Sequence, residues 1–194
     1  MEQLKLFDLP SPYRVHRPPR LPLSPPELAA WKQRISQYQT EMRPQTLPRQ
    51  GLLFGTEATD GHEPDDIDPF ALAPHSTLFW RQPPEAHLWE AHQKGCLYFI
   101  LDLHWPLLLY VGETQLSASQ RWRGTHHCKD YILRYLELHR QYHQPQQIVC
   151  TFWPHVPAQK RRLQQWEKQL ILKWRSPFNK ECWQWWGQPF GLLA

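Results

Sequence analysis

The sequence lacks any long apolar run. No segment approaches the roughly 18 consecutive apolar residues that cross a bilayer as a helix. Residues 1–12 also lack the apolar core of a secretory signal peptide. We therefore expect no membrane-spanning helix and a cytoplasmic location.

Cysteines are few and widely separated. The chain has four, and no two of them form a C-x-x-C pair: Cys96, Cys128, Cys150 and Cys182. This spacing indicates neither a zinc cluster nor a disulfide framework, and it fits a reducing compartment. His126 and His127 adjoin Cys128, but neighbouring residues on one short segment rarely converge on a single ion.

The two halves of the chain differ in composition. Residues 1–94 contain 14 of the 20 prolines and carry a formal charge of −2, whereas residues 95–194 carry +6. We expect a proline-rich, partly extended N-terminal region, with a tail over 1–23, an amphipathic helix over 24–43 and an acidic linker over 44–75. A folded domain should occupy residues 76–194, and its basic charge favours a polyanionic partner.

The helix expected over 24–43 has clear boundary signals. Ser24 and Glu27 have the spacing of a capping box, and Pro44 ends the helix. Apolar residues follow at helical spacing: Leu28, Trp31, Ile35, Tyr38 and Met42. Because about four turns are marginal alone, we expect this face to pack on the folded domain rather than on a partner helix.

The second half shows alternating strand and helix patterns. Two apolar, β-rich runs, 95–100 and 109–114, predict a hairpin. They are followed by a short helix over 117–124, a helix over 129–143, a strand over 147–153 and a long helix over 158–174. This order predicts an α+β fold with a small three-stranded antiparallel sheet flanked by helices.

An ordered set of polar residues runs through these elements. The hairpin carries Cys96-Leu97-Tyr98 and Tyr110-Val111-Gly112. Arg121, Glu167 and Pro177-Phe178-Asn179 follow. Over residues 94–182, about half of the chain, this series resembles the GIY-YIG nuclease domain found in homing endonucleases, some restriction enzymes and the incision module of bacterial excision repair. The resemblance implies the same α+β fold and divalent-metal-dependent cleavage of DNA.

Glu167 and Arg121 are the expected charged residues of the site. Glu167 is the only acidic residue between Glu137 and Glu181 and lies at the apolar edge of its helix. We expect it to hold Mg²⁺ or Mn²⁺, since one carboxylate and several waters suffice for Mg²⁺. The alternative is a surface ion pair. An arginine at position 121 can make two parallel hydrogen bonds to a phosphate.

The remaining site residues follow from the resemblance. Tyr98 is expected to activate the attacking water, Tyr110 to orient water or phosphate, His126 to relay protons or bind phosphate, and Asn179 to steady the site. For each of them, packing or capping is the alternative. The expected DNA-binding residues are Arg121, Arg123 and Lys129.

Three departures from the family pattern weaken the match. Cys96 occupies the usual place of the first glycine, although Gly95 precedes it. Glu113 follows the second glycine, where some relatives carry lysine. The intervals from Tyr110 to Arg121 and on to His126 are also longer than in typical members.

The N-terminus carries a second short motif, in which three apolar residues precede a proline-rich tract. Its pattern resembles the peptide by which bacterial polymerases and repair proteins dock on the sliding clamp, and the expected contacts come from Gln3, Leu4, Leu6 and Phe7. The alternative is an edge strand that covers the folded domain.

Together these patterns predict a metal-dependent DNA endonuclease that is structure-selective and linked to repair or replication. The alternative is a non-catalytic DNA-binding or clamp-associated module on the same fold. Action on RNA is a third option. The preferred substrate and the oligomeric state do not follow from the sequence.

Overall fold

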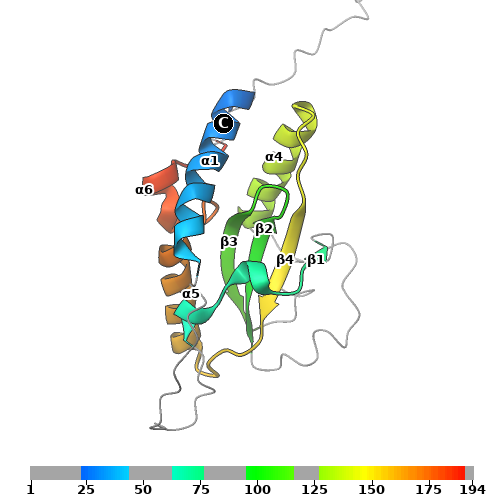
Figure 1. Cartoon of the computed structure of the whole chain (residues 1–194). Coiled ribbons are helices and arrows are strands. Elements are labelled where there is room, and N and C mark those ends of the chain that lie inside the picture. The colour runs from blue at the N-terminus through cyan, green and yellow to red at the C-terminus, as the bar shows by residue number, and fades with distance from the viewer. Residues whose placement is uncertain (1–22, 44–62, 77–94, 116–126, 191–194) are drawn as a thin grey trace, which may run out of the picture.

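A computed structural model describes residues 23–43, 63–76, 95–115 and 127–190. The predicted helix over 117–124 and residues 1–22 of the predicted N-terminal tail lie outside these residues. The elements with their bounds, drawn in Figure 1, are the helices α1 (Pro25–Met42), α4 (His127–Gln141), α5 (Lys160–Trp174) and α6 (Trp183–Trp186), the 3-10 turns η1 (Pro64–Asp66), η2 (Pro69–Ala71) and η4 (Lys180–Cys182), and the strands β1 (His75–Ser76), β2 (Cys96–Asp102), β3 (Leu107–Thr114) and β4 (Ile148–Trp153).

The fold is α+β, as predicted, with a small antiparallel sheet. Strands β4, β2 and β3 lie side by side with β2 in the centre, and the two-residue β1 adds to the outer edge of β4. Every residue of β2 is buried, which explains its unbroken apolar run. A bulge in the β2–β3 pairing falls between Ile100 and Leu101.

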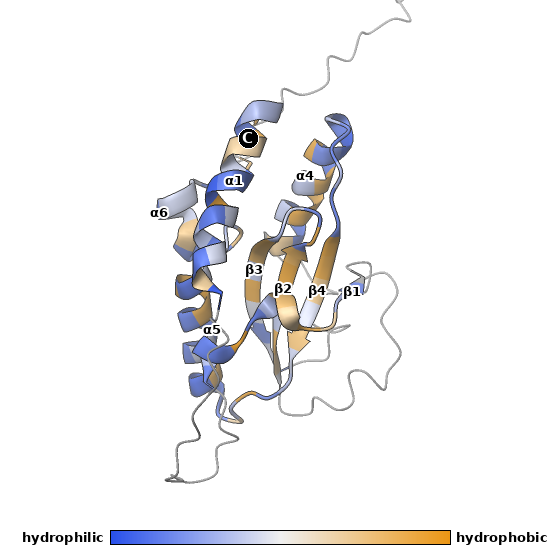
Figure 2. Ribbon diagram, in the orientation of Figure 1, coloured by the Kyte–Doolittle hydropathy of each residue, from blue (hydrophilic) through white to orange (hydrophobic). Residues whose placement is uncertain are grey.

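Two apolar clusters cover the sheet. Helices α1 and α4 form one cluster with residues that include Trp31, Tyr98 and Tyr135. Helix α5 forms the other with Ile67 and with β2 and β3 residues such as Phe99. Figure 2 shows apolar strands between helices whose outer faces are hydrophilic. Helix α1 therefore packs on the folded domain, as its apolar face predicts. No described helix is long and apolar enough to cross a membrane.

Residues 63–76 differ from the acidic linker predicted over 44–75. Ile67 is only 1% exposed, and Pro64 and Pro69 are buried. The hydroxyl of Thr151 in β4 donates to the carbonyl of Pro69 at 3.3 Å. The sequence does not indicate these apolar contacts for two reasons. The segment is rich in charged residues, and its two prolines restrict it to single 3-10 turns, which show no helical periodicity.

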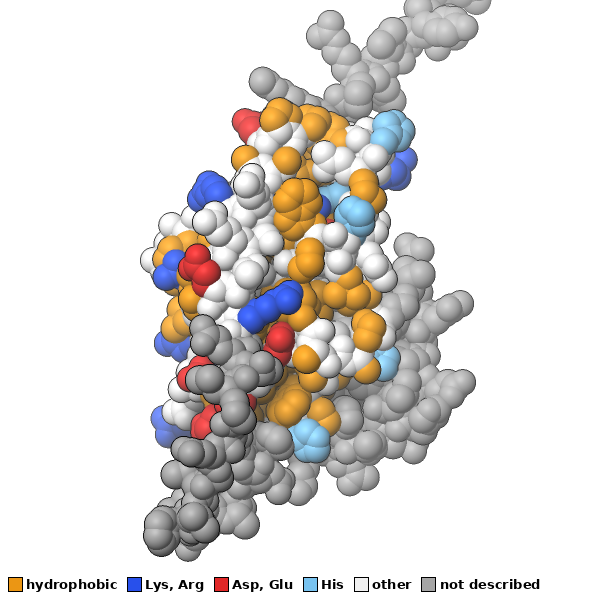
Figure 3. All heavy atoms as spheres, in the orientation of Figure 1, with side chains coloured by type: hydrophobic (Ala, Val, Ile, Leu, Met, Phe, Trp, Pro, Cys, Tyr) orange, Lys and Arg blue, Asp and Glu red, His pale blue; other side chains and the backbone are white. Residues whose placement is uncertain are grey.

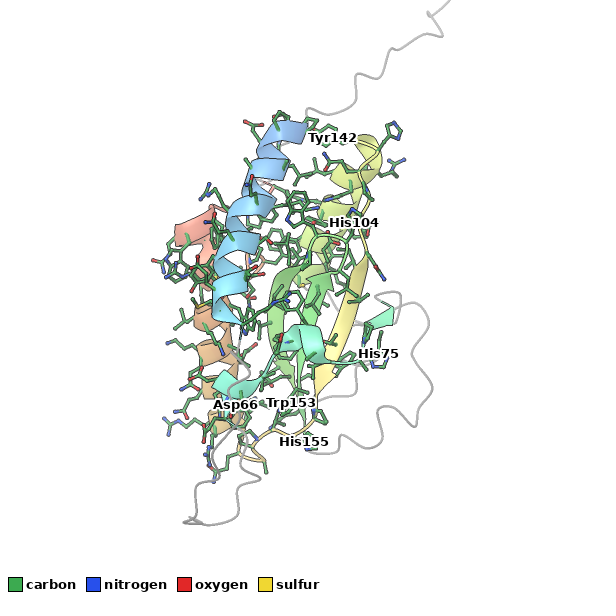
Figure 4. All side chains as sticks on the ribbon, viewed as in Figure 1. Asp66, His75, His104, Tyr142, Trp153 and His155 are labelled. Carbon is green, nitrogen blue, oxygen red and sulfur yellow. The ribbon has the colours of Figure 1, made fainter. Side chains whose placement is uncertain are left out.

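A buried polar network joins α1, α4 and the end of the sheet. The Asp102 carboxylate is fully buried at the end of β2. Its Oδ2 accepts from the Tyr135 hydroxyl at 2.7 Å and from Lys32 Nζ at 3.5 Å. Its Oδ1 accepts from the backbone N–H groups of His104 and Gln147, each at 3.0 Å, at the sheet end marked by His104 in Figure 4. One carboxylate thus ties both helices to the β2–β3 turn and to the start of β4.

His139 completes this network in its neutral form. Its Nδ1 lies 2.7 Å from the carbonyl of Tyr135, which can only accept, so Nδ1 carries the proton. Nε2 then accepts from Lys32 Nζ at 3.0 Å. Burial lowers the pKa of His139, and Lys32 and His104 lower it further against the opposing effects of the Tyr135 carbonyl and Asp102. Protonation would place a second cation against the Lys32 ammonium.

We predict acid sensitivity from this arrangement. Because the folded-state pKa of His139 lies below its usual value near 6.5, the unfolded chain binds more protons as the pH falls below about 6.5. The free energy of unfolding should therefore decrease, by at most about 1.4 kcal/mol per pH unit for this one group. Urea unfolding between pH 7.5 and 5 should show a smaller decrease in His139→Gln, whose amide oxygen can still accept from Lys32. Equal slopes in the two proteins would contradict the prediction.

Candidate functional site

The candidate site is organised on the segment Tyr110–Glu113 of β3. Tyr98 of β2 pairs with Gly112 across the sheet, and the Tyr98 ring lies over this glycine. A Cβ at position 112 would lie 2.3 Å from Tyr98 Cζ and 2.4 Å from its hydroxyl oxygen. The rings of Tyr98 and Tyr110 have centroids 5.9 Å apart. Glycine is thus the residue that lets both tyrosines occupy one small region of the sheet.

Asn179 binds the open edge of the same segment. Its side-chain Oδ1 accepts from the N–H of Val111 at 3.0 Å, and its Nδ2 donates to the carbonyl of Val111 at 2.9 Å. The Ser176 hydroxyl donates to the same Oδ1 at 2.6 Å, and Asn179 is only 5% exposed. The side-chain amide therefore makes the two hydrogen bonds that the backbone of a neighbouring strand would make, and it fixes the position of β3.

Glu167 reaches the next residue along this edge. Its Oε1 accepts from the backbone N–H of Glu113 at 3.1 Å, and its side chain is half-buried between α5 and β3. The carboxylate is therefore oriented by the strand. A carboxylate has about four lone-pair sites on its two oxygens, so one such hydrogen bond is compatible with metal ligation.

Gln39 of α1 binds the same edge farther along and was not predicted from the sequence. Its Oε1 accepts from the N–H of Leu108 at 2.8 Å, and its Nε2 donates to the carbonyls of Leu108 and Trp174 at 2.9 and 3.0 Å. The carbonyl of Leu109 accepts from the N–H of Phe178 at 2.9 Å. The only sequence signal for Gln39 is its place one residue after Tyr38 on the apolar side of the helix.

Four of the six predicted catalytic residues lie in the described part of the chain, and all four meet this segment: Tyr98, Tyr110, Glu167 and Asn179. Lys129 lies in the first turn of α4 and is half-exposed. The other predicted residues of the site, Arg121, Arg123 and His126, lie outside the described residues. So do the predicted clamp contacts, Gln3, Leu4, Leu6 and Phe7.

The acidic groups at the site fit a lightly coordinated hard cation. Glu167 binds the backbone of Glu113, so two carboxylate-bearing residues share this edge. Within the described residues, no cluster of three or more His, Cys, Asp or Glu could form a larger metal cage. One or two carboxylates with several waters are a common set of ligands for Mg²⁺ and are too few for a structural zinc site.

Gly112→Ala should disrupt the site. The new methyl group would lie under 3 Å from the buried Tyr98 ring and from Tyr110 Cε1, so at least one ring must move. We expect a loss of about 1–3 kcal/mol in the free energy of unfolding. Any reaction that depends on these tyrosines should slow by about 100-fold. Adding Tyr98→Leu should recover stability but not activity, which urea unfolding and the cleavage assay below would measure. Wild-type activity in Gly112→Ala would contradict this geometry.

The two ends of the sheet thus have different characters. The Asp102 network lies at the end marked by His104, and the Tyr110–Glu113 segment lies toward the end marked by Trp153, because Trp153 pairs with Leu97 beside Tyr98.

In comparisons with known proteins, no family model, no curated protein and no solved structure matches this chain.

Proposed function

We propose that this protein is a divalent-metal-dependent endonuclease that hydrolyses phosphodiester bonds in DNA, with the chemistry of the GIY-YIG nucleases. One observation carries the proposal. Tyr98 lies in β2, Glu167 in α5 and Asn179 in the loop after α5, yet all three reach the four-residue segment that begins with Tyr110. The sequence motif identifies these residues but gives no distances between them. Their convergence is therefore independent support.

Each residue has a definable task in hydrolysis. Water must lose a proton and attack phosphorus, the bond to the leaving oxygen must break, and that oxygen must be neutralised. We assign water activation to Tyr98 and the orientation of water or phosphate to Tyr110. Asn179 acts as a positioning residue, because both the oxygen and the nitrogen of its side-chain amide are hydrogen-bonded to the backbone of Val111.

Glu167 would hold the metal, with Mg²⁺ or Mn²⁺ as the expected ion. When bound, the ion supplies positive charge for the phosphate and the departing oxygen. The carboxylate is suited to this role because the N–H of Glu113 fixes its orientation while its helix packs on β3. Arg121 is proposed to bind the phosphate oxygens, as its guanidinium geometry allows.

The test is cleavage of labelled linear, flapped and four-way DNA, with a matching RNA set. We expect Mg²⁺-dependent cleavage of DNA that EDTA abolishes, with a preference for branched over linear substrates. Cleavage of RNA alone would reassign the substrate. If none of the substrates is cut in Mg²⁺ or Mn²⁺, the nuclease proposal fails.

One observation favours a second candidate, a non-catalytic DNA-binding or clamp-associated module. Tyr98 has 0% exposure, whereas a residue that activates water must reach solvent or substrate. This candidate predicts DNA binding without cleavage of any substrate.

We also propose that residues 3–7 tether the protein to the sliding clamp in the cytoplasm. Removing these residues should then abolish clamp binding while leaving DNA cleavage unchanged.

A further inference from the structure

The register of β3 changes immediately before Tyr110. Ile100 of β2 pairs with Tyr110, but Leu101 pairs with Leu108, so Leu109 has no partner in β2 and is the extra residue of a bulge. One extra residue reverses the face of the sheet to which each following side chain points. Bulges are common beside active sites, where they re-aim a side chain. The bulge therefore sets the direction of Tyr110.

The two apolar clusters show this reversal. Leu107 and Leu109 lie in the cluster with α1 and α4, whereas Leu108 lies in the cluster with α5. Uninterrupted alternation would direct the next residue, Tyr110, to the α5 face. Instead, Tyr110 packs against the cluster with α1 and α4, which also contains Tyr98. The bulge thus brings the two tyrosines of the candidate site to the same face of the sheet.

Gln39 of α1 holds the bulge from the outer edge of β3, which is the last of the described strands in the sheet. Its side-chain amide binds the N–H and the carbonyl of Leu108 at 2.8 and 2.9 Å, as a paired strand would. Its Nε2 also donates to the carbonyl of Trp174, which ties the bulge to the end of α5. Gln39 is only 1% exposed, so water does not compete for these groups. Figure 1 shows α1 alongside β3, and Figure 3 shows side chains, many of them hydrophobic, filling the face between α1 and the strands.

Two further anchors of this edge come from the loop after α5. Phe178 donates its N–H to the carbonyl of the extra residue at 2.9 Å, and Asn179 binds Val111. Tyr110 therefore lies between backbone groups that are held on both sides. Phe178 contributes only its backbone, and Asn179 belongs to the motif. Gln39 is thus the anchor that lies outside the motif and that a substitution can remove.

We propose that Gln39 is a positioning residue for hydrolysis, because it stabilises the bulge that turns Tyr110 to the face of Tyr98. This inference rests on the proposed function, in which Tyr110 orients water or phosphate. It makes α1 part of the nuclease site, although the helix precedes the region of the resemblance, 94–182. A displacement of about 1 Å in such a site can slow a reaction by about 100-fold.

The test compares cleavage by Gln39→Met and Tyr38→Phe. Methionine is similar to glutamine in length but makes none of the three hydrogen bonds of the amide. Tyr38→Phe is the matched control, because it removes a hydrogen bond from the adjacent residue of α1 to the carbonyl of Lys173, and this bond does not involve β3. Single-turnover cleavage in Mg²⁺ should be about 10- to 100-fold slower in Gln39→Met at a temperature at which both variants are folded. Binding of the same DNA in EDTA should be unchanged, and the control should cut and bind as wild type does.

A second readout does not depend on cleavage. The ring centroids of Tyr98 and Tyr110 are 5.9 Å apart, so NMR should detect a nuclear Overhauser effect between the two rings. This signal should weaken in Gln39→Met and persist in the control. If Gln39→Met does not fold, Gln39→Glu takes its place. It keeps an acceptor for the N–H of Leu108 and should show the same two losses in milder form.

Wild-type cleavage and an unchanged ring–ring signal in folded Gln39→Met would overturn the inference. Equal losses in Gln39→Met and Tyr38→Phe would also overturn it, since they would report only weaker docking of α1. If the wild-type protein cuts no substrate but Gln39→Met still loses the ring–ring signal, the nuclease proposal fails, and the role of Gln39 in holding the bulge stands.

Discussion

Glu167→Gln should lower the rate of DNA cleavage by about 1,000-fold or more, equivalent to about 4 kcal/mol of transition-state stabilisation. The reason is the loss of the charge that would hold the metal. Glutamine retains a carbonyl oxygen at the position of Oε1, which accepts from the N–H of Glu113 at 3.1 Å. The contact between α5 and β3 should therefore persist, and the temperature of unfolding should change by only a few degrees.

The measurement is single-turnover cleavage in Mg²⁺, with DNA binding in EDTA and thermal unfolding as parallel readouts. Glu113→Gln is the matched control, because it removes a carboxylate from the same edge but leaves the backbone N–H in place. We expect a smaller loss of rate in this control. A Glu167→Gln variant that cuts DNA at the wild-type rate would show that Glu167 is only a structural contact of α5.

Asp102→Ala should be the most destabilising single change, with a loss of about 3–5 kcal/mol in the free energy of unfolding. The substitution leaves the Lys32 ammonium buried without its counter-ion. It also removes the acceptor for the Tyr135 hydroxyl and for the backbone N–H groups of His104 and Gln147. Urea unfolding measured by circular dichroism would give the value, provided that the variant folds.

A second pair of variants keeps this prediction testable if Asp102→Ala does not fold. Asp102→Asn retains the acceptor oxygen while removing the charge, so it should lose less stability than Asp102→Ala. Lys32→Met in the Asp102→Asn background should restore part of that loss, because the unpaired buried cation is gone. Independent, additive effects of Lys32→Met and Asp102→Asn would contradict the assigned ion pair.

The fold was largely predictable where one physical signal dominated. The apolar run over 95–100 predicts one strand of a hairpin, and β2 is that strand, with all seven of its residues buried. Leu163, Trp166, Leu170 and Trp174 recur at helical spacing, and all four are buried in α5. In these segments, hydrophobic periodicity and chain breakers agree, so local sequence was sufficient.

Polar residues on buried faces were not predictable from periodicity. Lys32 and Gln39 lie in α1 beside its apolar positions and are only 3% and 1% exposed. Their burial depends on partners 69 to 135 positions away in the chain, namely Asp102, His139, Leu108 and Trp174. No local pattern encodes such pairings, because each forms only after the helix has docked.

The candidate site divides in the same way. The motif indicates which residues to expect in the site, but it does not give the contacts between them. Asn179 is an example. The resemblance predicts that Asn179 steadies the site, and in the structure its amide makes two hydrogen bonds to the backbone of Val111 in β3. The role of Gly112 is also geometric, since it follows from a Tyr98 ring that leaves no room for a Cβ.

The central claim is that the Tyr110–Glu113 edge, with Glu167, forms a metal site for phosphodiester hydrolysis. The most direct test is a crystal structure of the protein with DNA and Mn²⁺, examined for anomalous scattering. We expect a peak about 2 Å from a Glu167 carboxylate oxygen, with a phosphate of the DNA at the same ion. Density for bound DNA with no ion at Glu167, or with an ion held elsewhere in the chain, would contradict this account.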